Sequence, residues 1–278
     1  MTKTRIAITG VMLTGVILSC GSFDLMPPRG GWMWVAFDND TFNRMYILDP
    51  TTGIVKKKLP GCGVGGRTGD DAHNGHMTWG DGRLWGTGYN DDFGGYWCEI
   101  NQETGGVIEY FDVPGGRGGG IAWDGSRLWY TDNHNVYTID PSDNSYEFQF
   151  ETGWHGDYYT YHPNYSLAWD GNYLWSMGIQ VEDTLGVVYL YQFDVSEKVE
   201  VRRLELDYIS WQRDSPSGLA YDGEAFWLTT YKSSSRIYRI SPVDGSSLGY
   251  IVPRTVSLTG EETIIDKPFA VAFEFPSE

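Results

Sequence analysis

Short apolar segments alternate along the chain with polar turns rich in Gly, Asp, Asn and Pro. Runs of this kind, bounded by turn residues, predict β-strands and not long helices. Several of the runs, such as Gly218–Tyr221, are apolar at nearly every position. A sheet with one face in water would instead alternate apolar and polar residues. The pattern therefore predicts short strands in sheets that are covered on both faces.

One unit recurs along the chain, and its first half is two apolar segments joined by Asp-Gly. Four copies align without gaps, namely HMTWGDGRLWGT (76–87), GIAWDGSRLWYT (120–131), SLAWDGNYLWSM (166–177) and GLAYDGEAFWLT (218–229). Asp-Gly between apolar segments is a strong hairpin signal, because Gly supplies the positive φ that a tight turn needs. Each unit therefore opens with two antiparallel strands.

The second half of each unit is a third strand, a turn and a fourth strand. The third strands are MYILD (45–49), YWCEI (96–100), VYTID (136–140), LYQFD (190–194) and IYRIS (237–241). Turns such as Asp49–Gly53 and Ser241–Gly245 follow, and fourth strands such as Tyr146–Glu151 and Val199–Leu206 complete the units. Four antiparallel strands in about 40–50 residues are the signature of a β-propeller blade.

A fifth copy is split between the two ends of the chain. Trp32–Ala36 matches its second strand, and Ala270–Phe273 matches its first strand. We therefore predict an all-β, five-bladed β-propeller over residues 32–278, with four antiparallel strands per blade. The C-terminal strand, Phe269–Phe275, should pair beside the N-terminal strands and close the ring, which removes the exposed edges of an open array.

The first 31 residues are typical of a signal peptide followed by a short tether. Lys3 and Arg5 precede the uncharged stretch Ile6–Leu18, which is too short to span a bilayer and fits a signal peptide over residues 1–19. The sequence Ile-Leu-Ser-Cys-Gly at 17–21 resembles the lipobox of bacterial lipoproteins. This resemblance implies that Cys20 is lipidated, that residues 20–31 tether the domain, and that the membrane is a partner through this lipid. The alternative is an ordinary secretory signal with an incidental Cys20.

The net charge of the chain limits the classes of partner that it can bind, and the state of its cysteines depends on the compartment. With 37 acidic and 20 basic residues, the chain has a formal net charge of −17. Nucleic-acid binding needs a basic face, so this partner class is excluded. We expect the protein to be extracytoplasmic and membrane-anchored, in a periplasm or on a cell surface. Outside the cytoplasm Cys62 and Cys98 can form a disulfide, and two separately buried thiols are the alternative.

The order of strands within a blade decides which connections share a face. The first-to-second and third-to-fourth turns lie on one face, here called the turn face. The second-to-third loops and the crossovers between blades lie on the other, here called the loop face. The loop-face segments are long and irregular, and all five histidines fall in them or at their junctions with strands. Because binding residues concentrate on loops over a rigid scaffold, we predict a ligand site on this face.

The candidate ligand-binding residues are the ring-bearing and charged side chains of those segments. They are Arg67, Asp70, His73, His76, His134, Trp154, His155, Asp157, Tyr158, Tyr161, His162, Trp211, Arg213 and Asp214. The segment from Trp154 to His162 suits a carbohydrate, aromatic or peptide ligand, or else packs as an aromatic plug. Residues 211–214 either anchor a ligand by charge or contain a structural Arg–Asp pair.

No cofactor is predicted, and no metal site is assigned. Asp70–His76 offers oxygen and nitrogen ligands, but zinc sites usually need three or four converging protein ligands. Asp38–Asn43 has the oxygen ligands that calcium prefers but lacks the glycine and distal Glu of an EF-hand loop. Calcium at that segment or in the channel stays open as a weaker alternative.

The repeated Trp-Asp-Gly…Leu-Trp resembles secreted bacterial β-propellers, among them the glutamine-cyclotransferase-like and the gluconolactonase-like (SMP-30-like) groups. The resemblance covers about residues 32–275 and concerns packing and turn residues, so it implies the fold and transfers no catalytic residue. Our leading hypothesis is a lipid-anchored propeller that binds a small molecule, glycan, peptide or protein on its loop face. Two alternatives stay open: a propeller enzyme of glutaminyl cyclotransferase-like or lactonase-like type, and a structural subunit of a cell-envelope complex.

Overall fold

We describe the protein from a computed structural model. The description covers residues 31–38, 43–62, 64, 75–90, 94–113, 119–132, 134–152, 166–182, 185–232 and 235–274. In this part of the chain, no helix has the length and apolar character that a membrane crossing requires. The predicted signal peptide, the predicted lipidation site at Cys20 and the predicted tether lie outside the described residues, apart from Gly31.

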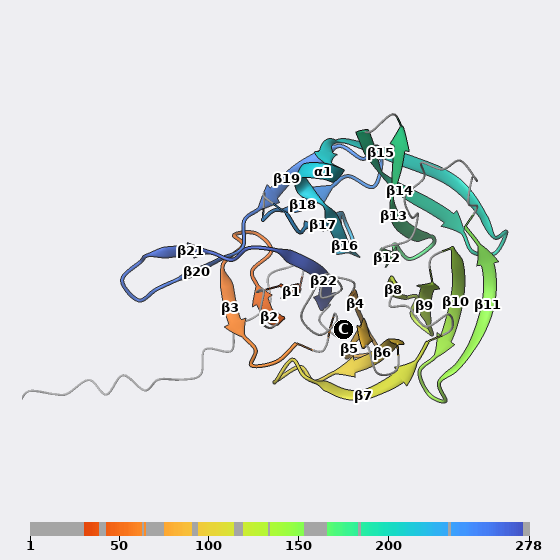
Figure 1. The fold of residues 1–278 in the computed structure, drawn as a ribbon, viewed down its shortest axis with the longest axis horizontal. Coiled ribbons are helices and arrows are strands. Elements are labelled where there is room, and N and C mark those ends of the chain that lie inside the picture. The colour runs from red at the N-terminus through yellow and green to blue at the C-terminus, as the bar shows by residue number, and fades with distance from the viewer. Residues whose placement is uncertain are drawn as a thin grey trace, which may run out of the picture.

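Five antiparallel sheets of four strands each form five blades around a common axis (Figure 1). From the axis outwards, blade 1 contains β22 (Pro268–Glu274), β1 (Trp32–Phe37), β2 (Arg44–Leu48) and β3 (Val55–Lys58). Blade 2 contains β4 (Met77–Gly80), β5 (Arg83–Asn90), β6 (Gly94–Ile100) and β7 (Val107–Asp112). Blade 3 contains β8 (Ile121–Trp123), β9 (Leu128–Asp132), β10 (Asn135–Asp140) and β11 (Ser145–Glu151).

The last two blades have the same order of strands. Blade 4 contains β12 (Ser166–Trp169), β13 (Leu174–Glu182), β14 (Leu185–Asp194) and β15 (Val199–Ser210). Blade 5 contains β16 (Pro216–Tyr221), β17 (Phe226–Thr230), β18 (Ile237–Ile240) and β19 (Ser247–Ile251). The predicted five-bladed, all-β architecture is confirmed, and Figure 1 shows the blades in sequence order around the ring.

The ring closes through the C-terminal strand, as the split repeat predicts. Strand β22 pairs antiparallel with β1, with Val271 opposite Val35. The inner strands then contact one another in the order β22, β4, β8, β12, β16 and back to β22. Both ends of the domain therefore share one sheet, and this sheet joins the first blade to the last.

Two elements in the connections depart from the prediction. The crossover before β22 contains a two-stranded sheet of β20 (Arg254–Val256) and β21 (Glu262–Ile264), which projects from the ring beside β3 (Figure 1). The crossover after β15 contains one turn of helix, α1 (Trp211–Asp214), whose N-cap is Ser210. Both were predicted as irregular loops, because neither belongs to the repeat that identified the blade strands.

A hydrogen bond inside each blade explains why Trp and Asp-Gly repeat together. In blades 3, 4 and 5 the indole Nε1 of the second-strand tryptophan donates to the hairpin aspartate five positions earlier. The pairs are Trp129–Asp124 at 2.8 Å, Trp175–Asp170 at 2.7 Å and Trp227–Asp222 at 2.7 Å. In blade 1 the closing strand supplies the acceptor, because Trp34 Nε1 donates to Glu274 Oε2 at 3.1 Å.

Blade 2 varies this arrangement by one residue. Its Asp-Gly pair, Asp81-Gly82, lies one position later than in the other copies, and both residues have positive φ (54° and 69°) in a two-residue hairpin turn. Gly80 therefore stands where the other copies have Asp, and Trp85 Nε1 donates to the Gly80 carbonyl at 3.2 Å. The ungapped alignment of the four copies concealed this offset, since both arrangements contain Asp-Gly.

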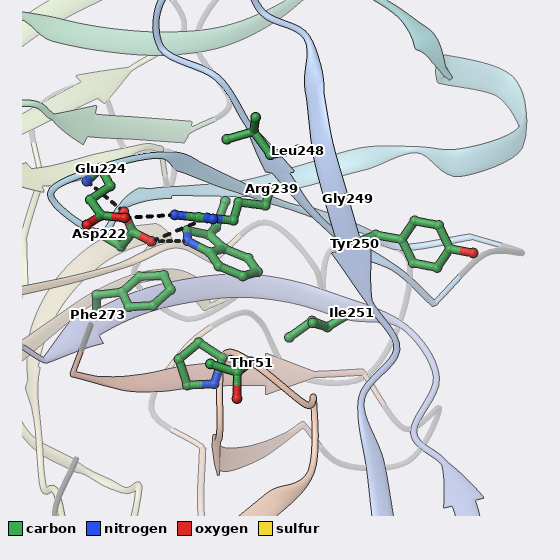
Figure 2. A pocket seen from close by; sticks show the side chains of 11 residues that line it. Thr51, Asp222, Glu224, Arg239, Leu248, Gly249, Tyr250, Ile251 and Phe273 are labelled. Atoms are coloured by element: carbon green, nitrogen blue, oxygen red, sulfur yellow. Dashed lines mark hydrogen bonds and ion pairs between the residues drawn. The ribbon is translucent and has the colours of Figure 1, made fainter. Parts of the chain in front are cut away.

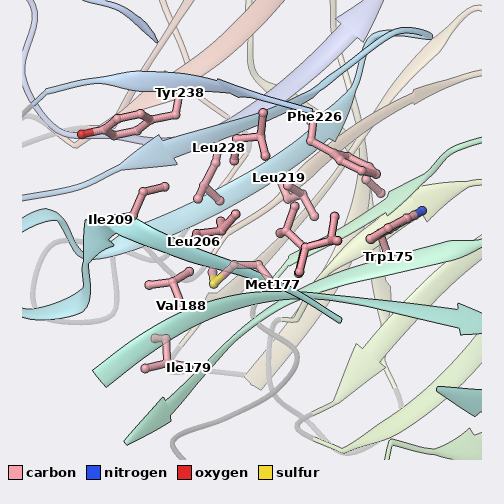
Figure 3. Packing of buried hydrophobic residues seen from close by; sticks show 14 residues of the cluster. Trp175, Met177, Ile179, Val188, Leu206, Ile209, Leu219, Phe226, Leu228 and Tyr238 are labelled. Atoms are coloured by element: carbon pink, nitrogen blue, oxygen red, sulfur yellow. The ribbon is translucent and has the colours of Figure 1, made fainter. Parts of the chain in front are cut away.

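Aromatic side chains on the inner strands pack against the tryptophans of the preceding blade. Trp169 of β12 stacks on Trp129 with 6.4 Å between ring centroids, and Phe273 of β22 lies 5.6 Å from Trp227. The apolar core between blades 4 and 5 includes Trp175, Met177 and Phe226 (Figure 3). Both faces of each sheet are thus covered by neighbouring blades, which accounts for the continuous apolar strands of the sequence.

Side-chain hydrogen bonds also connect adjacent blades near the axis. Thr87 of blade 2 donates to the Gly119 carbonyl at 2.7 Å, and Ser166 of blade 4 accepts from the backbone N–H of Leu219 at 2.7 Å. Both hydroxyls are fully buried or nearly so. The scaffold beneath the loops is therefore fixed by polar contacts as well as by apolar packing.

Candidate functional site

Strand order assigns the connections to the two faces as expected. Each sheet is antiparallel and ordered from inside to outside, so crossovers and second-to-third loops meet on the loop face. Many of the residues that the sequence predicts for this face lie outside the described residues. They are Arg67, Asp70, His73, Trp154, His155, Asp157, Tyr158, Tyr161 and His162. The structure describes His76, His134, Trp211, Arg213 and Asp214.

The two described histidines lie at loop-face ends of strands in different blades. His76 directly precedes β4 and is buried, with 3% of its surface exposed. Burial lowers the pKa of the His76 imidazole to about 3, so this ring is neutral at physiological pH. His134 directly precedes β10, and its carbonyl accepts from the backbone N–H of Thr152 at 2.8 Å.

The residues at 211–214 form α1 and are held together by the carboxylate of Asp214. This side chain is fully buried; its Oδ2 accepts from Ser210 N at 2.9 Å and from Arg213 Nη2 at 3.0 Å. The Ser210 side chain in turn caps α1 by accepting from Arg213 N at 3.3 Å. These contacts fit the structural Arg–Asp pair that the sequence left open as an alternative.

Trp211 contributes differently, because its ring lies between a cation and the adjacent sheet. Lys232 Nζ stands 5.6 Å from the centre of the Trp211 ring. A Cβ at Gly186 in β14 would lie 2.9 Å from Trp211 Cδ1, so a glycine is required where the indole packs on the sheet. A charged and aromatic surface thus exists on the loop face beside α1.

A second polar cluster on the loop face was not predicted as a unit. The Tyr231 hydroxyl donates a short hydrogen bond to Asp38 Oδ2, and Asp38 N donates to the Lys267 carbonyl at 3.1 Å. Lys267 Nζ stands 5.8 Å from the centre of the Tyr231 ring. We call Asp38, Tyr231 and Lys267 the closure cluster. Asp38 follows a strand of blade 1, Tyr231 follows a strand of blade 5, and Lys267 lies in the crossover that joins these two blades.

Backbone strain accompanies the closure cluster. Lys267 has φ of 60° and Ser235, in the loop after Tyr231, has φ of 45°. Non-glycine residues rarely adopt this left-handed region, and such strain concentrates at functional sites. Ser235 Oγ also donates to Asp266 Oδ1 at 2.5 Å, which holds the loop against the crossover.

The sequence contained a signal for this cluster that its interpretation did not use. From the sequence, Asp38 is a candidate only as an oxygen ligand for calcium, and the predicted site residues do not include Tyr231 or Lys267. Ring closure by β22 brings the last blade beside the first, so the loops at 38–44 and 231–235 and the crossover at 253–268 must be neighbours on one face. Combining closure with the face assignment would have identified the cluster.

The structure has Cys62 and Cys98 as free thiols, without the predicted disulfide between them. Cys62 and Cys98 belong to one apolar cluster that also contains Leu59 and Ile100. Cys62 Sγ donates to the Val64 carbonyl at 3.5 Å, and burial raises the pKa of this thiol to about 12. Burial also raises the pKa of Cys98. Both thiols therefore pack as small apolar side chains, which is the alternative that the sequence allowed.

Metal ligands are not assembled in the described part of the chain. Within it, no group of three or more His, Cys, Asp or Glu side chains converges on one point. In the calcium candidate at 38–43, residues 39–42 lie outside the described part, and Asp38 already accepts from the Tyr231 hydroxyl.

Comparisons with known proteins give a likeness of fold. No protein-family model matches the chain, and no curated protein sequence matches it. Among solved structures, Myxococcus xanthus glutaminyl cyclase is 14% identical, with a TM-score of 0.47 over 77% of this chain and 91% of that one. A 6-phosphogluconolactonase-like protein from Bacteroides fragilis is 12% identical, with a TM-score of 0.43 over 88% of this chain and 98% of that one. Kuenenia stuttgartiensis hydrazine synthase is 15% identical, with a TM-score of 0.41 over 86% of this chain and 71% of that one.

Proposed function

We propose that this protein is an extracytoplasmic, lipid-anchored β-propeller that binds a glycan, peptide or protein ligand on its loop face. The rigid ring carries this function, and the lipid on Cys20 holds the ring at a membrane surface. The observation that supports the proposal best is the closure cluster. It places a nearly buried carboxylate, a phenol hydroxyl and an ammonium group together, on strained backbone, at the face where the long loops meet.

The chemistry of the loop face suits a polar ligand with a flat or ring-shaped part. Tyr231 and Trp211 each lie beneath a lysine, so an aromatic surface and a hydrogen-bond donor occur side by side twice. Rings of this kind stack on sugars and peptide groups, while charged neighbours fix the orientation of the ligand. The Asp38 carboxylate adds an acceptor for hydroxyl or amide groups.

A thermal-shift screen of the full chain against glycans and peptides tests ligand binding. A ligand that binds only the native state raises the melting temperature by mass action. We expect the shift caused by a hit to fall by at least about half in Tyr231→Phe, which removes the hydroxyl donor, and in Asp38→Asn, which removes the charge of the acceptor. Tyr146→Phe, on the exposed surface of β11, is the matched control. Hits that are equally effective in all three variants would place binding away from the closure cluster.

The lipid anchor has its own test. Cys20→Ser should move the protein from the membrane fraction to the soluble fraction and abolish labelling by a fatty-acid analogue, because a single thiol is proposed to carry the lipid. Retention of the variant in membranes would contradict the anchor and leave ligand binding unaffected as a proposal.

Catalysis is a second candidate function, and one observation favours it. Asp38 is 8% exposed and hydrogen-bonded to a phenol beside an ammonium group, an arrangement that supplies acid and base groups. Turnover of N-terminal glutaminyl peptides or of lactones, abolished in Asp38→Asn with an unchanged melting temperature, would support an enzyme. Stable co-purification with an envelope complex, unaffected by loop-face variants, would instead support a structural subunit.

A further inference from the structure

A pocket of about 500 Å³, whose lining residues Figure 2 shows, opens between blades 5 and 1 on the turn face. Blade 5 contributes Asp222, Glu224, Trp227 and Arg239, while blade 1 contributes the turn at 50–51 and Phe273. Ligand pockets typically have volumes of about 300–1,000 Å³, so this opening can hold a side chain together with part of the chain that carries it.

The pocket exists because one residue in a cross-strand row lacks a side chain. In blade 5 Trp227 pairs with Arg239, and Arg239 pairs with Gly249 on the outermost strand. The residues in the same row position on the outer strands of blades 1 to 4 are Lys57, Glu109, Glu147 and Arg202. Gly249 has φ of 120°, and a Cβ there would meet nothing within 4 Å. A long charged side chain that the other blades carry is therefore missing at this position.

The space between blades 4 and 5 shows what fills the corresponding position. Arg202 on β15 lies over Trp175, with its Cζ 5.3 Å from the ring centre. Its guanidinium donates to the carbonyl of Pro242 at 2.8 Å and to the carbonyl of Val243 at 2.9 Å. These two carbonyls belong to the third-to-fourth turn of blade 5, so the arginine of one blade is bound by the turn of the next.

The corresponding turn of blade 1 lines the pocket and contains the equivalent carbonyl groups. Pro50 and Thr51 correspond to Pro242 and Val243, and both turns close with a backbone bond to glycine, Gly53 N to Asp49 O at 2.8 Å and Gly245 N to Ser241 O at 3.0 Å. Within the described part of the chain, the carbonyls of Pro50 and Thr51 accept no hydrogen bond. The turn whose counterpart binds a guanidinium between blades 4 and 5 therefore lines an open pocket between blades 5 and 1.

Arg239 does not replace the missing group. Arg239 lies on β18, the third strand of blade 5. Its Cζ is 5.9 Å from the centre of the Trp227 ring, and its guanidinium donates to Glu224 Oε2 at 3.0 Å. Figure 2 shows its guanidinium directed toward Asp222 and Glu224. It therefore covers the tryptophan, and no described contact joins it to the blade 1 turn.

Charge in the two spaces points to the same group. Asp170 and Arg202 balance each other between blades 4 and 5, where Asn172 occupies the position of Glu224. Among the residues that line the open pocket, Asp222 and Glu224 outnumber Arg239 by one negative charge. One additional cation would restore the balance found in the filled space.

We propose that this pocket binds an arginine side chain carried by an extended peptide segment of a partner protein. The guanidinium donates to the carbonyls of Pro50 and Thr51 and to the Glu224 carboxylate, which is 82% exposed and uses only Oε2 for Arg239. Guanidinium groups have several donors in a fixed planar fork, which matches two adjacent carbonyls better than an ammonium group does. The partner thus supplies the contact that Arg202 supplies within the chain.

Titration of the full chain with two acetylated tripeptide amides, Gly-Arg-Gly and Gly-citrulline-Gly, tests the proposal by calorimetry or NMR. Citrulline keeps the shape of arginine but is neutral, so we expect it to bind about tenfold more weakly. Glu224→Gln should weaken the arginine peptide about threefold. Glu99→Gln removes the partner of Arg83 in blade 2, a comparable ion pair away from the pocket, and should leave affinity unchanged.

Three results would overturn the proposal. They are no binding of the arginine peptide at about 10 mM, equal binding of both peptides, and an affinity lost equally in Glu224→Gln and Glu99→Gln. Both glutamates are at least partly exposed, so the variants should fold, and equal melting temperatures would verify this. The outcome does not depend on the closure cluster, because the pocket lies on the opposite face of the ring.

Discussion

The indole Nε1 of Trp175 donates to the Asp170 carboxylate at 2.7 Å, and this bond joins the first hairpin of blade 4 to its second strand. The same aspartate accepts from the backbone N–H groups of Asn172 and Tyr173 at 2.8 and 2.7 Å through its other oxygen. One side chain therefore fixes the turn and orients a tryptophan that is fully buried between blades. The repeat therefore carries this Trp–Asp hydrogen bond from blade to blade. The bond accounts for the fold and does not indicate an activity.

Asp170→Ala should destabilise the protein by about 2–3 kcal/mol, because it leaves the buried indole donor and two turn N–H groups without their acceptor. Asp143→Ala is the control, since Asp143 lies in an outer turn and accepts from Ser145 N at 2.9 Å. The control should lose less than about 1 kcal/mol. Urea unfolding of both variants measures the difference, and similar losses would show that the indole contact contributes little.

His76 should make the protein less stable in mild acid. Burial lowers the pKa of His76 to about 3, against a usual value of 6.5. In mild acid the imidazole therefore binds a proton in the unfolded chain but stays neutral in the folded protein. The stability associated with this group is complete above pH 6.5 and decreases as pH falls toward 3. The slope should approach about 1.4 kcal/mol per pH unit below pH 6.

Unfolding free energies of the wild type and His76→Leu between pH 7 and 5 measure this effect. The variant should lose stability less steeply than the wild type, whatever its stability at pH 7. Parallel curves for wild type and His76→Leu would mean that His76 binds its proton equally well in the folded and unfolded states, which would contradict the lowered pKa.

Truncation after Lys267 should give an aggregating or protease-sensitive product. It removes β22, which is the inner strand of blade 1 and contributes Phe269, Val271 and Phe273 to the core. Without that strand, β1 becomes an exposed edge that can pair with other chains. Truncation after Glu274 retains the whole strand and is the matched control. Light scattering and limited proteolysis distinguish the two, and a soluble, resistant short form would contradict ring closure as a requirement for folding.

The repeat allowed the fold to be predicted from the sequence, because each blade carries the same local solution to the same packing problem. An Asp-Gly pair followed by a tryptophan, as in Asp222-Gly223 and Trp227, predicts a hairpin in each copy of the repeat. The split copy predicts closure of the ring by β22. The hairpin of β20 and β21 and the turn α1 escaped prediction because each occurs once.

Sites were harder to predict, since they depend on side chains from blades that are far apart in sequence. Asp38 and Tyr231 are separated by 193 positions and become partners only at the ring closure. The pocket beside Gly249 could not be predicted from the sequence. It depends on the lack of a side chain at a strand position where blade 4 has Arg202, and this equivalence is known only from the strand register. The thiols of Cys62 and Cys98 share one apolar cluster, yet their number and the predicted compartment alone could not determine whether they are bonded.

Arg202→Met should destabilise the protein by about 2 kcal/mol, because it removes hydrogen bonds from a charged donor to the Pro242 and Val243 carbonyls while keeping the apolar stem. The neighbouring Arg203→Met is the matched control. Arg203 forms an exposed ion pair with Glu200 on the same strand at 2.8 Å, and such pairs contribute about 0–1 kcal/mol. Urea unfolding of the two variants compares an arginine bound between blades with one bound at the surface. Equal losses would show that the turn carbonyls do not select a guanidinium, and this result would also weaken the assignment of arginine to the open pocket between blades 5 and 1.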